Sequence, residues 1–288
     1  MKIGIIVEML RLPMEDGIRK AKELGAEGIQ IYAVSRYLNM LEDPAIRLKE
    51  LKNIADANGL CFSAVCSDLG GHGFADPAGN PERLEKTNRI MEASHIFESK
   101  VLTTHIGVVP KADDVSRYAD MVETLKKAGN MALAEGMTLA IETGPESAAD
   151  LRKLILDVDN AGIRVNFDPA NLAMVQNEDA AEAVALLGEF IVHTHAKDGL
   201  HLQDCDPARV YNAFAEGGFA KLVEETGELF REVPLGEGQV NWDPYLKALK
   251  ASGYDGFLTI EREVGANPEK DIAMAVTFLK RKLSALTP

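Results

Sequence analysis

The sequence is short of cysteine, long apolar runs and basic charge. It contains only Cys61, Cys66 and Cys205, an odd and sparse set that is not a disulfide framework. No apolar run approaches the roughly 18 residues that span a bilayer, and the first residues show no cleavable signal pattern. We therefore expect a cytoplasmic protein without a membrane partner.

Basic residues are outnumbered, with 31 Lys and Arg against 45 Asp and Glu, and the formal charge is −14. A field of this sign repels phosphate backbones, so nucleic acid is not expected as a partner. The sequence also lacks the HExxH and G-x-S-x-G motifs and any clustered basic patch. No short catalytic motif therefore identifies an active site, and candidate functional residues must be sought among single polar residues.

Short apolar runs typical of strands alternate with amphipathic stretches typical of helices. Eight such units of about 30 residues predict an α/β fold, the (β/α)8 TIM barrel. The expected strands are 3–7, 28–32, 61–66, 100–105, 137–142, 163–168, 190–195 and 256–261. The expected helices are 13–25, 44–59, 81–97, 113–135, 147–162, 242–253 and 268–286.

An open doubly wound sheet is the alternative, and it would carry a Gly-rich phosphate loop after its first strand. The segment EMLRLPMED, which follows strand 3–7, has no such loop. No linker or low-complexity stretch divides the chain, so we expect one domain over residues 1–288.

One connection is too long for a simple loop, because residues 198–240 separate the seventh strand from its helix. A short helical stretch is expected within it, around 219–230. Long connections on this side of a barrel lie over the catalytic face. We interpret this one as part of the substrate pocket or as a contact in a homo-oligomer, a dimer or a tetramer.

Four consecutive strands end in a carboxylate or an imidazole: Glu142, Asp168, His195 and Glu261. The carboxyl ends of barrel strands converge on one mouth, so these side chains are expected to share one space. Three carboxylates at close range raise one another's pKa, and a divalent cation removes that cost. Oxygen-rich ligation suits Mn²⁺, Mg²⁺ or Co²⁺, with Zn²⁺ less typical. Alternatively, each residue is a separate helix cap or a solvated strand end.

Alternation along the strands places Ala140, Asn166, His193 and Thr259 one step deeper on the same inward face. Three of these four are polar, and they are candidates to hydrogen-bond the ligands from behind. His193 competes with His195 as a ligand. We favour His195, because it lies nearer the mouth, and we interpret His193 as a core histidine.

Four further residues near the mouth are candidate substrate-binding groups: His105, Glu146, Asn171 and Lys197. His105 ends the fourth strand and is otherwise a packing residue. Glu146 and Asn171 follow two of the candidate ligands closely, so each is alternatively a first-turn or capping residue of a helix. Lys197 follows His195 by two positions.

The motifs IETGPES, VNFDPANL, VHTHAKD, VPLGEGQVNWDPYLKAL and GYDGFLTIERE together resemble the xylose-isomerase-like sugar isomerase/epimerase superfamily. The match covers the second half of the chain closely, roughly 139–263. The resemblance implies a TIM barrel with one divalent metal, usually Mn²⁺, held by Glu142, Asp168, His195 and Glu261. In the ketose 3-epimerase branch the two glutamates also act as the acid/base pair. That branch has a histidine where this chain has Asn171.

We therefore expect a metal-dependent isomerase or epimerase of a sugar, sugar derivative or cyclitol. The metal would hold a carbonyl oxygen and a neighbouring hydroxyl, and the glutamates Glu142 and Glu261 would remove and return a proton. One alternative is an inosose-type dehydratase or lyase using the same site. Another is a subunit of a larger carbohydrate-processing complex, although retention of all four ligands disfavours it. A multi-zinc endonuclease, also found in the superfamily, needs more histidines than the six scattered here.

Overall fold

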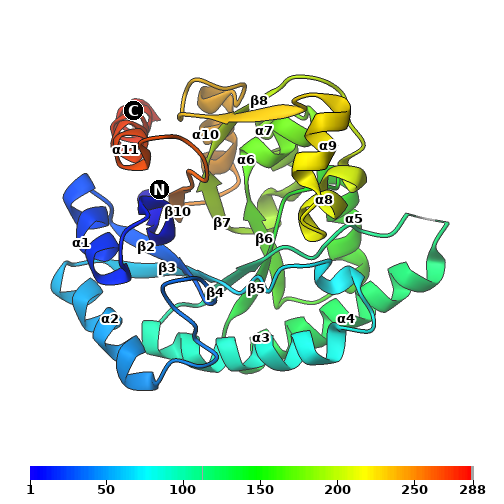
Figure 1. Ribbon diagram of the computed structural model, residues 1–288, viewed down its shortest axis with the longest axis horizontal. Coiled ribbons are helices and arrows are strands. Elements are labelled where there is room, and N and C mark those ends of the chain that lie inside the picture. Colours follow the sequence, from blue (N-terminus) through cyan, green and yellow to red (C-terminus); the bar gives the residue numbers. More distant parts are fainter. Residues whose placement is uncertain (112, 287–288) are drawn as a thin grey trace.

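Eight parallel strands close into a barrel in the computed structural model, which describes residues 1–111 and 113–286. The order around the barrel is β1-β10-β7-β6-β5-β4-β3-β2 (Figure 1). This confirms the predicted TIM barrel, and each expected strand agrees with the observed one to within one residue at either end. The barrel strands are β1 (Lys2–Ile6), β2 (Gly28–Tyr32), β3 (Cys61–Cys66), β4 (Val101–Thr104), β5 (Thr138–Glu142), β6 (Ile163–Phe167), β7 (Ile191–Ala196) and β10 (Phe257–Ile260).

Helices surround the barrel on its outside (Figure 1). The main ones are α1 (Met14–Leu24), α2 (Ala45–Ala57), α3 (Asn80–Ser94), α4 (Val115–Ala134), α5 (Ala148–Val158), α7 (Ala180–Leu187), α10 (Trp242–Ala251) and α11 (Pro268–Leu286). Shorter helical segments are Val7–Leu10, Gly73–Ala75, His95–Phe97, α6 (Pro169–Asn171), Leu172–Gln176 and Gly188–Phe190. Helix α7 was not expected, because eight residues are too short for a clear periodic signal. No helix in the described part of the chain is both long and apolar enough to cross a bilayer.

Local sequence signals set the ends of two helices as expected. Helix α1 ends at Gly25, whose φ of 101° is in the left-handed region that glycine adopts without strain. Helix α5 begins after Ser147, whose hydroxyl accepts a hydrogen bond from the backbone N–H of Asp150. These ends fix where the chain turns back toward the barrel.

The apolar core lies between the strands and the surrounding helices. On β5 and β6 the residues Leu139, Ile141, Val165 and Phe167 are fully buried. Phe167 stacks on Tyr245 of α10 with ring centroids 5.5 Å apart, so this set of alternate residues faces the helices. The intervening residues, including Asn166 and Glu142, therefore face the interior of the barrel.

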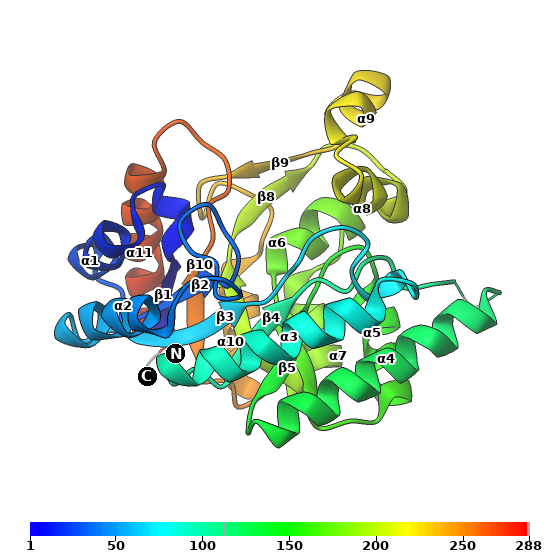
Figure 2. The same cartoon turned by 60° about the horizontal axis from the view of Figure 1, so that its bottom comes forward.

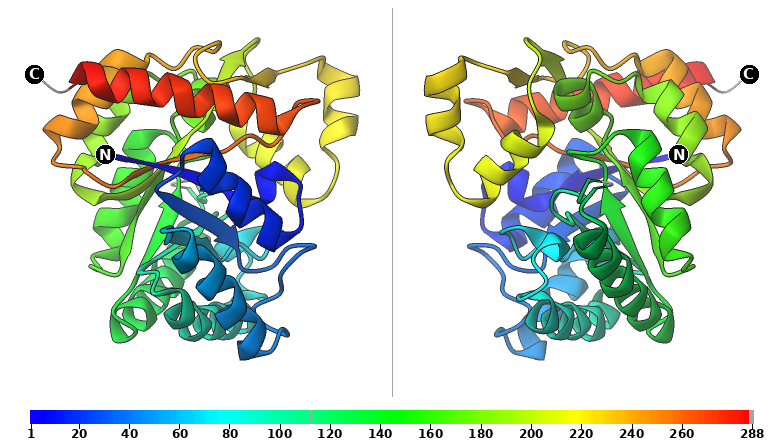
Figure 3. Two further views of the ribbon diagram at one scale, coloured as in Figure 1. Left: turned by 90° about the vertical axis from the view of Figure 1, so that its left-hand side faces the viewer. Right: turned by 90° about the vertical axis from the view of Figure 1, so that its right-hand side faces the viewer.

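The long connection, residues 198–240, is hereafter called the insertion, and it has its own structure. It contains a two-stranded antiparallel ribbon of β8 (Asp198–His201) and β9 (Phe230–Val233). In the chain, helices α8 (Pro207–Ala215) and α9 (Phe219–Thr226) connect β8 to β9. Both helices project from one side of the barrel (Figures 2 and 3). The helix expected at 219–230 is too long, because Gly227, with a φ of 82°, follows its last residue and Phe230 begins β9.

Asp198 ties the two ends of the insertion together. Its carboxylate accepts hydrogen bonds from the backbone N–H groups of Gly236 and Val240 and from the indole N–H of Trp242, at 2.9–3.1 Å. Farther along the ribbon, Arg262 pairs with Glu232 of β9 at 2.7 Å and with Asp271 of α11 at 2.9 Å. These buried contacts attach the ribbon to the barrel and hold the insertion over its mouth.

Candidate metal centre

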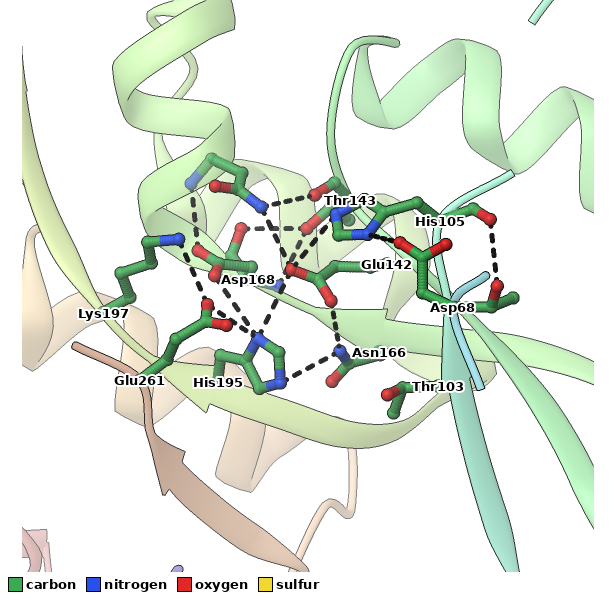
Figure 4. Close-up of polar contacts among 12 residues, drawn as sticks. Asp68, Thr103, His105, Glu142, Thr143, Asn166, Asp168, His195, Lys197 and Glu261 are labelled. Atoms are coloured by element: carbon green, nitrogen blue, oxygen red, sulfur yellow. Dashed lines mark hydrogen bonds and ion pairs between the residues drawn. The ribbon is translucent and has the colours of Figure 1, made fainter. Parts of the chain in front are cut away.

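The four polar strand ends meet in one cluster at the barrel mouth (Figure 4). Glu142 ends β5, Asp168 and Glu261 directly follow β6 and β10, and His195 lies in β7. One ligand atom from each of these residues lies within 4.8 Å of the others. His195 Nδ1 is 3.3 Å from Glu261 Oε2, 3.4 Å from Glu142 Oε1 and 3.5 Å from Asp168 Oδ2. The structure thus brings together the side chains that the sequence analysis selected.

The cluster is buried, and two of its atoms lack partners. Asp168 is 0% exposed and His195 is 1% exposed. Asp168 Oδ2 and His195 Nδ1 lie 3.5 Å apart, but neither atom has a hydrogen-bond partner in the described part of the chain. A buried polar atom without a partner costs free energy, and a cation among these atoms would satisfy both. The residues therefore fit a divalent metal with three oxygen ligands and one nitrogen ligand.

The electrostatics of the cluster also favour a cation. Burial alone would lower the pKa of His195, but the charges of Glu142 and Glu261 raise it well above its usual range. Burial raises the pKa of Asp168, and the negative charge of Glu261 adds to that rise. The raised pKa of His195 shows that the negative charge of the glutamates stabilises positive charge at this point, and burial of Asp168 adds a cost that a cation would reduce.

Polar residues deeper in the barrel hold the cluster in place. Asn166 donates to Glu142 Oε2 over 3.1 Å. His195 Nε2 lies 3.3 Å from Gln30 Oε1 on β2, so a proton on Nε2 leaves the Nδ1 lone pair directed at the cluster. His193 lies deeper, with Nδ1 2.8 Å from Asn166 and Nε2 3.0 Å from Thr259, and it does not reach the cluster. The barrel interior is therefore a polar support for the mouth.

His105 and Lys197, two of the expected substrate-binding residues, lie beside the cluster and line the main cavity. His105 Nδ1 donates to Asp68 over 3.0 Å, and its Nε2 is 3.5 Å from Glu142 Oε1. Burial would lower the pKa of His105, but the charge of Glu142 and the bond to Asp68 raise it to about 10. Lys197 Nζ donates to Glu261 Oε2 over 3.1 Å, and its pKa is well above its usual range because the charge of Glu261 outweighs burial.

Asn171 and Glu146, the other two expected substrate-binding residues, are placed differently. Asn171 lines the main cavity, but its amide donates to Glu142 Oε1 over 3.2 Å and to the carbonyl of Thr143 over 3.1 Å. Glu146 lines a neighbouring cavity of about 580 Å³ instead. Neither of its carboxyl oxygens has a hydrogen bond, and burial raises its pKa to about 8.

The main cavity has a volume of about 650 Å³, and several of its residues were not anticipated. Tyr32 donates to Glu261 Oε1 over 3.4 Å, and Asp68 holds His105. Tyr32 ends β2 and Asp68 closely follows β3, so the strand-end argument would have found them if extended to those strands. Other wall residues come from the insertion: Tyr211, Phe214, Phe219, Phe230, Arg231 and Glu232.

Comparison with known sequences gives one family and a set of distant relatives. A family model described as xylose isomerase-like TIM barrel matches residues 18–282. An inosose dehydratase of Lacticaseibacillus casei is 26% identical over 187 residues, which is 60% of this chain and 59% of that protein. The chain thus spans less than two thirds of the length of the first curated relatives that it matches.

Solved structures share the fold over nearly the whole chain. A xylose isomerase domain protein from Planctomyces limnophilus matches with a TM-score of 0.79 and 23% identity, covering 99% of this chain and 97% of that one. A D-psicose 3-epimerase solved with D-fructose has a TM-score of 0.73 and 16% identity over 98% and 99% of the chains. A xylose isomerase-like protein from Mycobacterium smegmatis, in complex with magnesium, has a TM-score of 0.72 and 17% identity over 99% and 96%.

Proposed function

Because the chain belongs to the xylose isomerase-like TIM barrel family, we propose that it is a divalent-metal-dependent isomerase or epimerase of a sugar, sugar derivative or cyclitol. One observation carries the proposal: Glu142, Asp168, His195 and Glu261 form a buried cluster with two unpartnered atoms beneath a large cavity. We propose Mn²⁺ as the metal, with Mg²⁺, Co²⁺ and Zn²⁺ as alternatives. The magnesium complex of a structural neighbour supports the choice of a hard divalent ion.

The ion would act as a Lewis acid that polarises a substrate carbonyl. The two glutamates lie on the outer two of four adjacent strands, so they flank the substrate position from opposite sides. We assign one of Glu142 and Glu261 to remove the proton next to the carbonyl and the other to return it. Return to the opposite face gives epimerisation, and return to the adjacent carbon gives isomerisation.

The neighbouring residues support this proton transfer. His105 and Lys197 carry positive charge into the cavity, where they would bind substrate oxygens and stabilise the negative charge that develops on them. Asn171 positions Glu142 through its amide, and Tyr32 does the same for Glu261. Glu146 stays a prediction as a substrate-binding residue, because it lines the neighbouring cavity and not the main one.

Deuterium exchange tests the proposal without requiring the true substrate. The protein, loaded with Mn²⁺, is incubated in D₂O with ketoses, inososes and keto-glycosides, and NMR follows deuterium at the carbon next to the carbonyl. We expect uptake that disappears on chelation and in Asp168→Asn. Uptake by one or more compounds at an unchanged rate after complete removal of metal would refute a metal-dependent reaction.

A dehydratase is the second candidate, favoured by the similarity to inosose dehydratases and by Asn171 in place of the epimerase histidine. The same proton is removed, the electron pair forms a carbon–carbon double bond, and hydroxide leaves the β-carbon as water. The product is an unsaturated ketone, which absorbs in the ultraviolet. Absorbance growth on inososes would select this reaction over epimerisation.

The setting of the enzyme is also proposed. We place it in the cytoplasm, as a homodimer or homotetramer rather than as a subunit of a larger complex. The exposed side chain of Leu202 on the insertion supports a contact between copies. Sedimentation of the purified chain measures its mass directly.

A further inference from the structure

We infer that the main cavity contains a second subsite, built by the insertion, which binds an uncharged substituent with an apolar ring face. The inference rests on the proposed function and narrows its substrate class. It makes the substrate a glycoside or similar conjugate rather than a free or phosphorylated monosaccharide. Four residues of the insertion, called here the aromatic wall, form the subsite: Tyr211, Phe214, Phe219 and Phe230.

The aromatic wall is a continuous row of rings that begins beside the metal cluster. The His105 and Tyr211 rings are 6.4 Å apart, and Tyr211 is 6.4 Å from Phe214. Phe214 stacks on Phe219 at 4.1 Å, and Phe219 is 5.7 Å from Phe230. Tyr211, Phe214 and Phe219 lie on α8 and α9, the helices that project beside the mouth (Figure 2), and Phe230 begins β9.

The size of the cavity leaves room for more than one sugar ring. Its volume of about 650 Å³ lies in the range of about 300–1,000 Å³ typical of sites for larger organic ligands. A monosaccharide held at the cluster would leave the aromatic wall uncovered. The loops after β3 and β4 add Gly70, Gly71 and Gly107 to the lining, and Gly70 has open space where a side chain would be. The lining is therefore open at Gly70.

The exposure of Phe214 indicates an apolar occupant. Phe214 is 50% exposed although it lines the cavity. Aromatic faces gain free energy when another ring or an apolar sugar face covers them, because apolar surface leaves water and the rings stack. The wall is continuous with the cluster, so the group that covers it is the part of the substrate that does not react.

The charges of the cavity disfavour a phosphate. Its lining contains the cationic side chains His105, Lys197 and Arg231, and each is paired with a carboxylate. Lys197 is paired twice, with Glu261 and Glu263. Each of these cations is thus already balanced by a carboxylate, and among the described lining residues the carboxylates outnumber the cations. An anionic substituent would meet net repulsion here.

Binding of two unreactive probes tests the inference. Titration calorimetry compares phenyl β-D-glucopyranoside with methyl β-D-glucopyranoside on the Mn²⁺-loaded protein. We expect the phenyl glycoside to bind more tightly, and Phe214→Ala to reduce the affinity ratio by a factor of about 2 to 12, the worth of one ring stack. Saturation-transfer NMR should show the phenyl protons in closest contact with the protein.

Leu202→Ala is the matched control, because Leu202 is on the same insertion, is 42% exposed and does not line the cavity. It should leave the affinity ratio unchanged. Phe214 is half exposed, so its truncation should not unfold the chain, and a thermal melt verifies this. Phe219→Ala removes the neighbouring ring of the aromatic wall, and the affinity ratio of the two glycosides is measured for it as well.

Three results would overturn the inference. These are equal affinity for both probes, an affinity ratio unchanged in Phe214→Ala and Phe219→Ala, and tighter binding of glucose 6-phosphate than of glucose. A change of sedimented mass in Phe214→Ala with an unchanged ratio would assign the wall to a subunit contact instead. If deuterium exchange is absent but Phe214→Ala lowers the affinity ratio as expected, only the proposed function is refuted. If exchange occurs but the two substitutions leave the affinity ratio unchanged, only the subsite is refuted.

Discussion

Asp168 Oδ2 and His195 Nδ1 lie 3.5 Å apart, and neither atom has a hydrogen-bond partner in the described part of the chain. The other oxygen of Asp168 is fully used, since Oδ1 accepts from the backbone N–H groups of Ala170 and Asn171. One carboxylate thus caps α6 with one oxygen and leaves the other for a ligand. The cap fixes the direction in which the free oxygen points.

Metal binding should therefore depend on Asp168 more than folding does. We expect about one Mn²⁺ per chain after loading, and loss of tight binding in Asp168→Asn, because an amide is a neutral and weaker ligand. Asn caps a helix about as well as Asp, so the apo variant should lose little stability. Metal analysis after desalting measures the first effect, and thermal melts measure the second.

Asp179→Asn is a matched control for this substitution. Asp179 caps α7 through the same two backbone contacts, to Ala181 and Glu182, but lies outside the cluster. It should keep full metal content and the full rise in melting temperature that excess Mn²⁺ produces. Retention of stoichiometric metal by Asp168→Asn would show that the site lies elsewhere.

Lys197 should stabilise the mouth when no metal is bound. It is 5% exposed and neutralises Glu261 and Glu263. Lys197→Met leaves Glu261 buried without its cation, so we expect a loss of about 3–5 kcal/mol in the free energy of unfolding of the apo protein. Excess Mn²⁺ should restore part of that loss, because it binds the folded state. Urea unfolding with and without Mn²⁺ measures both quantities.

The control for Lys197→Met is Lys153→Met. Lys153 pairs with Asp157 at 2.5 Å, but its side chain is 65% exposed. A surface pair of this kind contributes about 0–1 kcal/mol, and Mn²⁺ should not alter the effect. Equal losses in the two variants would mean that Lys197 has no special role at the mouth.

Glu8 gives the protein a pH-dependent weakness. Its Oε2 is buried without a partner, and burial raises its pKa from 4.5 to about 7. Between these pH values the folded state holds a proton that the unfolded state has released, so this residue lowers stability as the pH rises from 4.5 to 7. The gain in the free energy of unfolding caused by Glu8→Gln should therefore be about 3 kcal/mol larger at pH 8 than at pH 4.5.

Urea unfolding at the two pH values measures this difference, and exposed Glu50→Gln is the control. Gln keeps an acceptor for the N–H of Tyr32, which donates to Glu8 Oε1 over 3.0 Å. The neutral side chain should therefore retain the native contact. Each substitution changes the free energy of unfolding, and that change is compared at pH 8 and at pH 4.5. If the difference between the two pH values is no larger for Glu8→Gln than for Glu50→Gln, the pKa of Glu8 is not raised.

Strand positions and the cluster were predictable because both follow from short-range rules. Alternation and apolar runs locate strands, and barrel geometry brings the ends of neighbouring strands together. The same rules do not orient a side chain that depends on a distant contact. The ring of His195 is held by Gln30, which is 165 positions away in the chain. Nothing in the motif VHTHAKD indicates which nitrogen faces the mouth.

Glu146 shows the other limit of sequence reasoning. It follows Glu142 by four positions, and that proximity suggested a shared pocket. The chain leaves the strand at Thr143 and turns through Gly144 and Pro145, so Glu146 faces the neighbouring cavity. The insertion was likewise expected as a wall of the pocket, but its β8–β9 ribbon depends on pairing between segments about 30 residues apart. Local sequence patterns do not specify the register of such a pairing.

The last prediction separates proton transfer from metal binding at Glu142 and Glu261. Glu→Gln keeps the volume and one oxygen, so the barrel should fold in both variants. The amide cannot accept a proton, and loss of a positioned base costs a factor of about 10²–10⁴ in rate. Each variant, assayed with saturating Mn²⁺, should lose net turnover but retain deuterium exchange on the face served by the remaining glutamate. A variant with near wild-type turnover would make that glutamate a ligand only, and the acid/base role would pass to His105 or Lys197.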